Sequence, residues 1–310
     1  MTTASREVKM TTTMRRTKVR SSSGGVECVA WHYPGDNGAC VVMAGGLGVT
    51  KEPATDPFAT RFQDAGFSVL AFDFRHMGES DGEPRQVVYI DRQLADWRAA
   101  IEFATTLPEV NRDKIAIWGF SLSGGYIFRL ASRDHRLAAA MAVAPLADGP
   151  ASGRIALRQG DTTLSELNGM VWRAVKDASG ALLGRDPRLV ALNGEHGTAS
   201  ALTMPDSRNG DRALNPGNKY PEWRQEVAAR SALATALSRP ARSAPQIECP
   251  LLVVAFDDDG VAYAEPAIQA AHRAPRGELV RFPGGHYAAL LDQYEPAVAA
   301  QLEFLRRHLA

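Results

Sequence analysis

Short apolar runs alternate with amphipathic stretches along most of this chain. Five runs are apolar almost throughout, at 39–44, 68–74, 115–120, 137–144 and 250–256. They lack alternation of polar and apolar positions, which is typical of strands buried on both faces. Between two of them, Ile90, Leu94 and Trp97 fall at helical spacing. Strands alternating with such helices predict an α/β protein with a mostly parallel sheet covered by helices on both faces.

The beginning of the core carries a turn signal as well. Strand candidates at 26–33 and 39–44 are separated at 34–38 by Pro, Gly, Asp and Asn residues, which are turn formers. We therefore expect these two strands to form a hairpin. A strand at 278–282 and a helix that begins near Pro296 complete the core.

Residues 150–245 differ in composition from both flanks. Gly, Arg, Asn and Ala dominate there, and no clear strand pattern remains. We interpret this segment as an inserted, mainly helical cap that divides the core into 17–149 and 246–310. Residues 1–16 are expected to form a disordered N-terminal tail.

The apolar run at 115–120 leads into a cluster of small residues. Ser121 has Gly119 two positions before it and Ser123 two positions after it, as a nucleophile elbow requires where a strand and a helix pass closely. Glycine is more usual at the position of Ser123, and serine is a sterically mild replacement. An ordinary strand-to-helix turn with a capping serine is the alternative. A nucleophile at Ser123 would put Ser121 where the glycine belongs, so we assign the nucleophile to Ser121.

A serine hydroxyl needs an adjacent base, and that base needs an acid to orient it. Asp259 follows the apolar run at 250–256, and His286 follows the strand at 278–282. Ligand sites in open parallel sheets lie at the carboxyl ends of strands, and Ser121, Asp259 and His286 all come just after such ends. Their order along the chain, Ser then Asp then His, is the order of an α/β-hydrolase.

Other acids and bases remain open at this point. Asp148, Asp257 and Asp258 follow strands as well and are alternative acids. His76 lies in a polar loop upstream of the nucleophile, and His196 lies in the cap. We expect both of these histidines to be structural or to face substrate.

Acyl transfer also needs hydrogen-bond donors for the developing oxyanion. The N–H of Leu122 directly follows the nucleophile at a helix N-terminus, where the helix dipole adds positive potential. We assign the second donor to Leu47, in the glycine-containing loop at 45–48 that follows a strand. A plain glycine turn is the alternative for this loop.

Composition narrows the class of protein. The 310 residues are 45% hydrophobic with a formal net charge of zero, which fits one large core plus an insertion. Because Lys and Arg are scattered, neither nucleic acid nor a membrane is an expected partner. Cys28, Cys40 and Cys249 lie in or beside apolar runs, which favours buried thiols and a cytoplasmic location. The N-terminal residues contain no apolar stretch typical of a secretory signal or a membrane span.

We expect no cofactor and no metal. The loop at 45–48 is not followed by the lysine and serine of a phosphate-binding P-loop. The aspartates at 257–259 lack the ligand spacing of a calcium loop, and the sequence contains no Cys/His cluster.

Several motifs together resemble those of the α/β-hydrolase superfamily. They are residues 46–51, 72–82, 118–125, 143–149, 223–230 and 283–287. More narrowly, the chain resembles the branch that includes the polyketide transferases of fungal natural-product pathways and their bacterial hydrolase relatives. The resemblance covers most of the chain from Val26 onward. It implies the α/β-hydrolase fold, with Ser121 as nucleophile, His286 as base and Asp259 as acid.

The chain departs from the family pattern at three places. Gly45 stands where relatives often carry His, and residues 260–263 replace a more usual Ser-Val-x-Pro sequence. Residues 287–289 replace a stretch that contains Phe and Asp. These departures fall in the loop assigned to the oxyanion and beside the acid and the base.

Taken together, these residues predict a serine hydrolase that cleaves a carboxylic ester or thioester through an acyl-enzyme on Ser121. The alternative is an acyltransferase that passes the acyl group to an alcohol or amine, and exclusion of water by the cap would decide between them. A non-catalytic binding protein of the same fold is a third possibility, although such proteins usually lose a triad member.

The expected partner is a small, natural-product-like acyl ester or thioester. Its apolar acyl pocket would lie in the cap, or these side chains would form the cap core instead. The candidates are Trp172, Met204, Tyr220 and Trp223. The identity of the substrate and the oligomeric state are not determined by the sequence.

Overall fold

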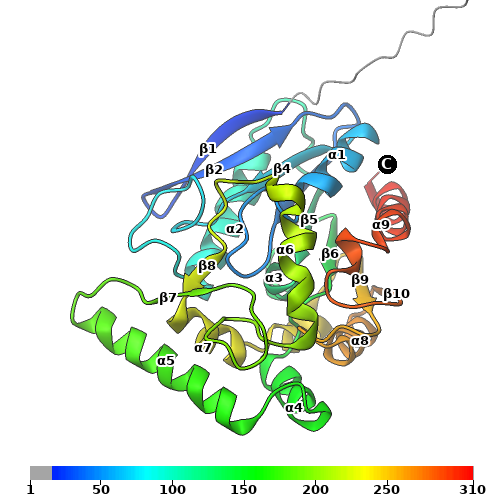
Figure 1. The fold of residues 1–310 in the computed structure, drawn as a ribbon. Helices are drawn as coiled ribbons and strands as arrows, with labels where there is room; N and C mark the ends of the chain where they lie inside the picture. Colours follow the sequence, from blue (N-terminus) through cyan, green and yellow to red (C-terminus); the bar gives the residue numbers. More distant parts are fainter. Residues whose placement is uncertain (1–15, 310) are drawn as a thin grey trace, which may run out of the picture.

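The computed structural model describes residues 16–309. Within them, eight strands form one sheet in the spatial order β1-β2-β4-β3-β5-β6-β9-β10 (Figure 1). The strands are β1 (Thr17–Ser23), β2 (Val26–Tyr33), β3 (Cys40–Ala44), β4 (Ser68–Phe72), β5 (Ile115–Phe120), β6 (Ala139–Val143), β9 (Leu251–Phe256) and β10 (Gly277–Phe282). Each of the five apolar runs therefore contains a strand of this sheet.

The sheet is parallel from β4 to β10, as the sequence predicts. At its other end, β2 pairs antiparallel with both β1 and β4. The predicted hairpin between 26–33 and 39–44 is wrong, because β4 lies between β2 and β3. The turn-forming residues at 34–38 make a different connection, in which Asp36 and Asn37 donate N–H bonds to the Gly66 carbonyl at 2.9 and 3.1 Å. The hairpin partner of β2 is β1, which the sequence pattern did not indicate.

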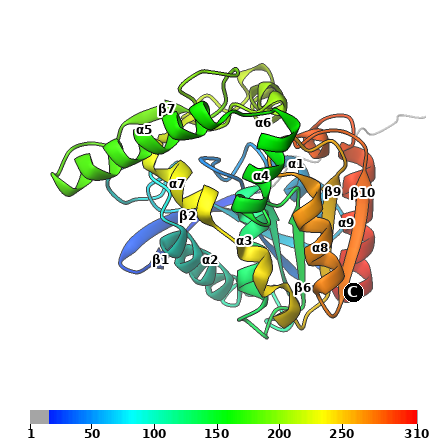
Figure 2. The same ribbon diagram turned by 90° about the horizontal axis from the view of Figure 1, so that it is seen from below.

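Helices cover both faces of the sheet, as predicted. Figure 2 shows α1 (Asp56–Asp64) and α9 (Tyr294–Leu309) on one side. On the other side lie α2 (Ile90–Ala104), α3 (Leu122–Ala131) and α8 (Ala264–Arg273). Between these layers, every residue of β3, β4, β5, β6 and β9 is buried. This burial on both faces explains why the runs contain no alternating polar positions.

The segment between β6 and β9 supplies no strand to the large sheet within the described residues. We use the name cap for residues 150–245, the division proposed from the sequence. The segment contains α4 (Gly149–Gln159), α5 (Leu164–Leu182), β7 (Leu189–Ala191), η1 (Pro205–Asn209), α6 (Gly210–Leu214), η2 (Pro216–Asn218), β8 (Glu226–Ala228), α7 (Ala229–Leu237) and η3 (Pro240–Gln246). Strands β7 and β8 pair antiparallel; with three residues each, they are too short to produce a periodic pattern.

Most of the predicted N-terminal tail, residues 1–15, lies outside the described residues. The predicted tail ended at residue 16, which is described: the Arg16 guanidinium donates to the Tyr33 hydroxyl at 3.0 Å and to Asp56 at 2.6 Å. None of the helices in the described part of the chain combines the length and apolar character that crossing a membrane requires.

A buried ion pair joins the loops that follow β3 and β4. The Lys51 side chain is 2% exposed and that of Asp73 is 0% exposed. Lys51 donates from Nζ to Asp73 Oδ2 at 2.8 Å and from its backbone N–H to Asp73 Oδ1 at 2.7 Å. Lys51 Nζ also donates to Glu79 at 2.6 Å. The pair therefore holds the C-terminal end of the loop that contains Leu47.

We expect Lys51→Met to lower the free energy of unfolding by about 3–5 kcal/mol, because it leaves the Asp73 carboxylate buried without its cation. Denaturant titration measures this loss. Lys18→Met is the matched control, since Lys18 pairs with Glu79 while both side chains are substantially exposed, and it should cost less than about 1 kcal/mol. Equal losses in the two variants would contradict a stabilising role for the buried pair.

Candidate active site

Ser121 lies at the turn between β5 and α3, with φ 57° and ψ −116°. A positive φ is strained for a residue with a side chain, so neighbouring contacts must hold it. The Ser121 N–H donates to Val143 O at 3.0 Å. The Ser121 carbonyl accepts from the N–H groups of Gly125 and Leu146 at 3.0 and 2.9 Å. The backbone of Ser121 is therefore anchored to α3 and to the end of β6.

The turn leaves no room for a side chain at Gly119. A Cβ atom there would overlap the Ser123 carbonyl and lie 2.8 Å from the Gly124 nitrogen. Gly46 approaches the turn from the other side, and a Cβ atom on it would lie 3.0 Å from Ser121 Cβ. These close approaches are the steric requirement that the spacing of small residues indicated.

Three side chains that are distant in sequence form a chain of hydrogen bonds at this turn. His286 Nε2 lies 2.9 Å from Ser121 Oγ, and His286 Nδ1 lies 2.9 Å from Asp259 Oδ2. His286 is 1% exposed and Asp259 is 5% exposed. The arrangement can move a proton from the serine hydroxyl to the imidazole while the carboxylate orients the ring.

Backbone donors hold the other oxygen of the Asp259 carboxylate. Oδ1 accepts from the N–H groups of Val261 at 2.9 Å and Ala262 at 2.7 Å. Burial alone would raise the pKa of Asp259, but His286 and these two N–H groups outweigh it and hold the pKa below its usual value. The carboxylate is therefore ionised around neutral pH.

The alternative acids have other partners. Asp257 accepts from Arg281 at 2.8 Å. Asp258 accepts from the Gly284 N–H at 3.1 Å, and Asp148 caps α4 through the Ala151 N–H at 2.9 Å. Among the described residues, these three carboxylates make no hydrogen bond to His286.

The alternative bases also lie elsewhere. His76 is buried, and its Nε2 lies 3.2 Å from the Arg92 guanidinium. Burial lowers the pKa of His76, as do the neighbouring arginines, Arg92 and Arg75. His196 is half exposed and pairs with Glu166 at 3.0 Å. Neither histidine forms a hydrogen bond to Ser121.

Leu47 and Leu122 both line a cavity beside Ser121. The first hydrogen bond of α3 runs from Gly125 to Ser121, and no side chain caps the helix N-terminus. The N–H of Leu122 thus has no partner within the helix. On the other loop, Val49 donates to Gly46 O at 3.3 Å and closes the turn that contains Leu47.

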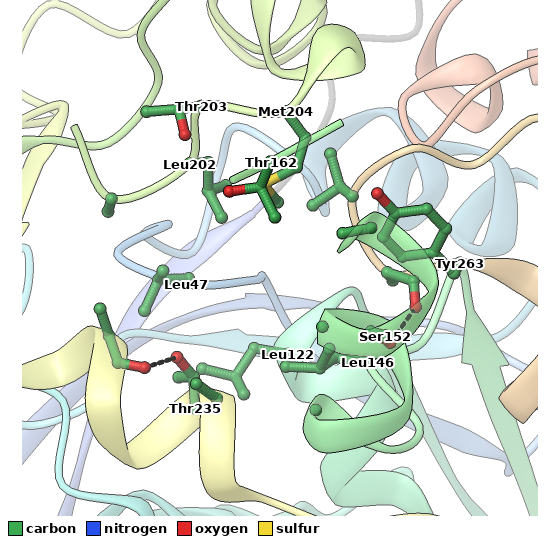
Figure 3. Close-up of a pocket in the computed structure, with 18 of the residues that line it drawn as sticks. Leu47, Leu122, Leu146, Ser152, Thr162, Leu202, Thr203, Met204, Thr235 and Tyr263 are labelled. Atoms are coloured by element: carbon green, nitrogen blue, oxygen red, sulfur yellow. Dashed lines mark hydrogen bonds between the residues drawn. The ribbon is translucent and has the colours of Figure 1, made fainter. Parts of the chain in front are cut away.

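The cavity has a volume of about 140 Å³ and a mostly apolar wall. Figure 3 shows Leu47, Leu122 and Leu146 on one side of it and Leu202, Thr203 and Met204 on the opposite side. Its polar side chains are the hydroxyl-bearing Ser, Thr and Tyr, and no charged residue contributes to the wall within the described chain. Such a cavity suits an uncharged apolar group placed next to the serine.

A family model described as serine aminopeptidase, S33, matches residues 35–293. The chain belongs to this hydrolase family. It is 35% identical to the quorum-quenching protein AidA of Acinetobacter baumannii, over 93% of this chain and 94% of the relative. It is 34% identical to the polyketide transferase af380 of Aspergillus fumigatus, over 54% of each chain.

The solved structures agree with the family. The crystal structure of the α/β hydrolase GrgF from Penicillium sp. sh18 matches with a TM-score of 0.77 at 24% identity, over 95% of this chain and 99% of that chain. This S33-family chain therefore has the α/β-hydrolase fold, as predicted. The resemblance to the branch containing polyketide transferases is confirmed as well.

Of the four aromatic and Met side chains suggested for the acyl pocket, the structure brings only Met204 to the cavity wall. Trp172 lies on the outer face of α5, where it is 68% exposed. Tyr220 is buried and donates from its hydroxyl to Asp56 at 3.2 Å. Trp223 donates from Nε1 to Gly48 O at 2.8 Å. Composition cannot tell which face of a cap element points inward, and this is why these assignments differ from the structure.

Asp206, a residue of η1 in the cap, is a neighbour of the site that was not predicted from the sequence. Its carboxylate accepts a hydrogen bond from the His286 N–H. A Cβ atom on Gly285 would overlap this carboxylate, so the approach requires glycine there. A glycine before the histidine is visible in the sequence, but nothing in it identifies the partner, which is 80 positions away from His286. The cap segment also contains nine acidic residues, so no single one stands out.

We expect Gly119→Ala to lower the free energy of unfolding by about 1–3 kcal/mol, because the added methyl overlaps backbone that cannot move freely. It should also slow covalent labelling of Ser121 by a fluorophosphonate, since the turn must shift. Gly180→Ala in α5 is the control, because the nearest atom to its Cβ would be 3.7 Å away. A Gly119→Ala protein as stable and as reactive as the parent would contradict the steric account.

Proposed function

We propose that the chain is a serine hydrolase that cleaves a carboxylic ester or thioester through an acyl-enzyme on Ser121. The observation that carries the proposal is the pair of 2.9 Å hydrogen bonds from His286 to Ser121 and to Asp259. In the proposed reaction His286 takes the proton of the Ser121 hydroxyl as the oxygen attacks the carbonyl carbon. His286 then returns the proton to the leaving alcohol or thiol.

Asp259 has two roles in this proposal. It fixes the ring of His286 with Nε2 toward the serine, and its negative charge stabilises the imidazolium that forms during attack. Both roles need an ionised carboxylate, and the lowered pKa of Asp259 supports that state. Water then attacks the acyl-enzyme by the same sequence of proton transfers.

The N–H groups of Leu122 and Leu47 are the proposed oxyanion donors. Leu122 is the first residue of α3, so the helix dipole adds to its effect. The close approach of Gly46 to Ser121 supports a donor from the adjoining Leu47, because it brings that loop against the nucleophile.

The cavity supports an apolar, uncharged acyl group. An aminopeptidase must bind the free ammonium of its substrate, and burying that charge without a carboxylate is costly. The wall of this cavity contains no acidic side chain among the described residues. We therefore favour esters and thioesters over peptides with a free N-terminus, despite the description of the family.

An acyltransferase is the second candidate, because the relative af380 is named a polyketide transferase. The same acyl-enzyme would form, and an alcohol or amine would replace water. The cavity wall is mostly apolar and is formed by core and cap residues. Transfer to an acceptor would be favoured over hydrolysis if the bound acceptor excluded water from the acyl-enzyme.

We expect Ser121→Ala to reduce hydrolysis of short p-nitrophenyl esters by about 10⁴-fold or more and to abolish labelling by a fluorophosphonate. Ser123→Ala is the matched control, because the Ser123 hydroxyl is fully buried and has no hydrogen-bond partner in the described structure. Its turnover should stay within about threefold of the parent. Retained turnover in purified Ser121→Ala would end the proposal. A parent protein that the probe does not label would indicate a non-catalytic binding protein.

Product analysis separates hydrolysis from transfer. With an acyl thioester and a range of alcohol and amine acceptors, a hydrolase yields the free acid throughout, and its product ratio does not depend on the acceptor. We expect the free acid to dominate with small acceptors. An acylated acceptor as the main product, formed only with Ser121 intact, would favour the transferase.

A further inference from the structure

Two side chains of the cap donate to, or accept from, the backbone of the two loops that flank Ser121. We propose that Trp223 and Asp206 are positioning residues. Through them the cap holds residues 45–50, the oxyanion loop, and residues 283–288, the histidine loop, in the geometry that catalysis needs. The inference rests on the proposed function and adds to it a role for the cap. Both side chains bond to backbone atoms, whereas the Ser121 hydroxyl and the Asp259 carboxylate are the hydrogen-bond partners of the His286 ring in the described structure, so we assign Trp223 and Asp206 a positioning role.

Trp223 holds the loop that contains Leu47. Its indole is 5% exposed, and Nε1 donates to Gly48 O at 2.8 Å. Gly48 has φ +63°, and a Cβ atom on it would lie 3.5 Å from Leu192 and 3.7 Å from Val227, both in the cap. The peptide next to the proposed oxyanion donor therefore lies against cap residues. The core side of the same loop is held independently, by the pair of Lys51 with Asp73.

Asp206 holds the loop that contains His286. One carboxylate oxygen accepts from the His286 N–H, and the other accepts from Asn209 Nδ2 at 3.1 Å. On its core side the same loop is held by Asp258, which accepts from the Gly284 N–H at 3.1 Å. A buried backbone N–H that loses its partner is costly. Removing the Asp206 carboxylate therefore frees the histidine backbone on the cap side only.

The contacts of Trp223 and Asp206 reach the backbone of the two loops, whereas other polar contacts of the cap lie elsewhere on the core or involve side chains only. Lys219 and Tyr220, for example, reach Asp56 at the start of α1. These two contacts attach the cap without touching either loop. Tyr287, which follows His286, also joins the histidine loop to the cap by donating from its hydroxyl to Asn193 at 3.2 Å, but this bond does not involve the loop backbone.

Through Trp223 and Asp206, by contrast, the position of the cap affects the geometry of the proposed oxyanion donor, Leu47, and of the proposed base, His286. The catalytic geometry of both loops consequently depends on the cap being packed against the core. If the cap moves away, each loop loses one of the hydrogen bonds that fix its backbone.

Two variants of the full chain and a control for each test this inference, and Asp206→Asn serves as the conservative replacement. Trp223→Phe removes the N–H donor and keeps an aromatic ring, and Asp206→Ala removes the acceptor. Trp97→Phe is the control for the first, because the buried Trp97 Nε1 has no hydrogen-bond partner in the described structure. Ser207→Ala is the control for the second, since Ser207 is the next residue of η1, fully buried and without a partner.

The first measurement is hydrogen exchange by mass spectrometry, which needs no turnover. We expect Trp223→Phe to speed exchange in residues 45–50 about tenfold and to leave residues 283–288 unchanged. Asp206→Ala should do the reverse. The control variants should change neither segment beyond about twofold.

The second measurement is ester hydrolysis, at a temperature where every variant is folded. We expect kcat to fall about tenfold in Trp223→Phe and Asp206→Ala while KM changes less than about twofold, because the loss lies in transition-state geometry. Asp206→Asn should recover most of kcat, since its amide oxygen can still accept from His286.

The two measurements separate the possible failures. If the parent protein neither hydrolyses esters nor reacts at Ser121, the proposed function fails, and the exchange pattern alone decides whether the cap holds the loops. If exchange in both segments matches the controls, the positioning role is overturned. It is also overturned if kcat in Trp223→Phe and Asp206→Ala equals that of their controls.

Discussion

The strained backbone of Ser121 is the constraint on which the site depends. A positive φ turns the chain sharply enough to expose the hydroxyl between β5 and α3, and it persists because Val143, Leu146 and Gly125 hold the serine's peptide groups. These anchors belong to the end of β6 and to α3, so the geometry of the nucleophile depends on the packing of the central sheet. The glycines around it are needed because the backbones come close, and flexibility is not their role here.

The site combines polar groups that are held firmly with an apolar wall. Burial would oppose ionisation of Asp259, but two backbone N–H groups and His286 compensate for the lost water. The cavity beside Ser121 has no charged side chain among its described lining residues, which suits an uncharged acyl group. The buried pair of Lys51 with Asp73, which holds one of the loops, is not part of the cavity wall.

Much of this site could be predicted because its signals are local. The small residues around Ser121 follow from how closely a strand and a helix can pass, and Asp259 and His286 follow strands whose ends meet at one edge. The sequence left Asp257 and Asp258 open as acids. The structure separates them from His286, because Asp257 pairs with Arg281 and Asp258 accepts from Gly284. Strand pairing was harder to predict from the sequence. Turn-forming residues such as those at 34–38 occur both in hairpins and in connections between strands that are not neighbours, and here β4 lies between β2 and β3.

The sequence by itself determined the α/β class, the strands buried on both faces and the three residues proposed for catalysis. Each of these depends on periodicity or on short-range steric limits, which a linear pattern records. Only the tertiary structure decided that Trp223 and Asp206 reach the backbone of the catalytic loops and that Trp172 faces outward. The reason is physical. Every residue has a backbone carbonyl and nearly every residue has a backbone N–H, so a side chain that bonds to one of these groups does not depend on the type of residue that carries it. The sequence therefore does not indicate which two residues are joined.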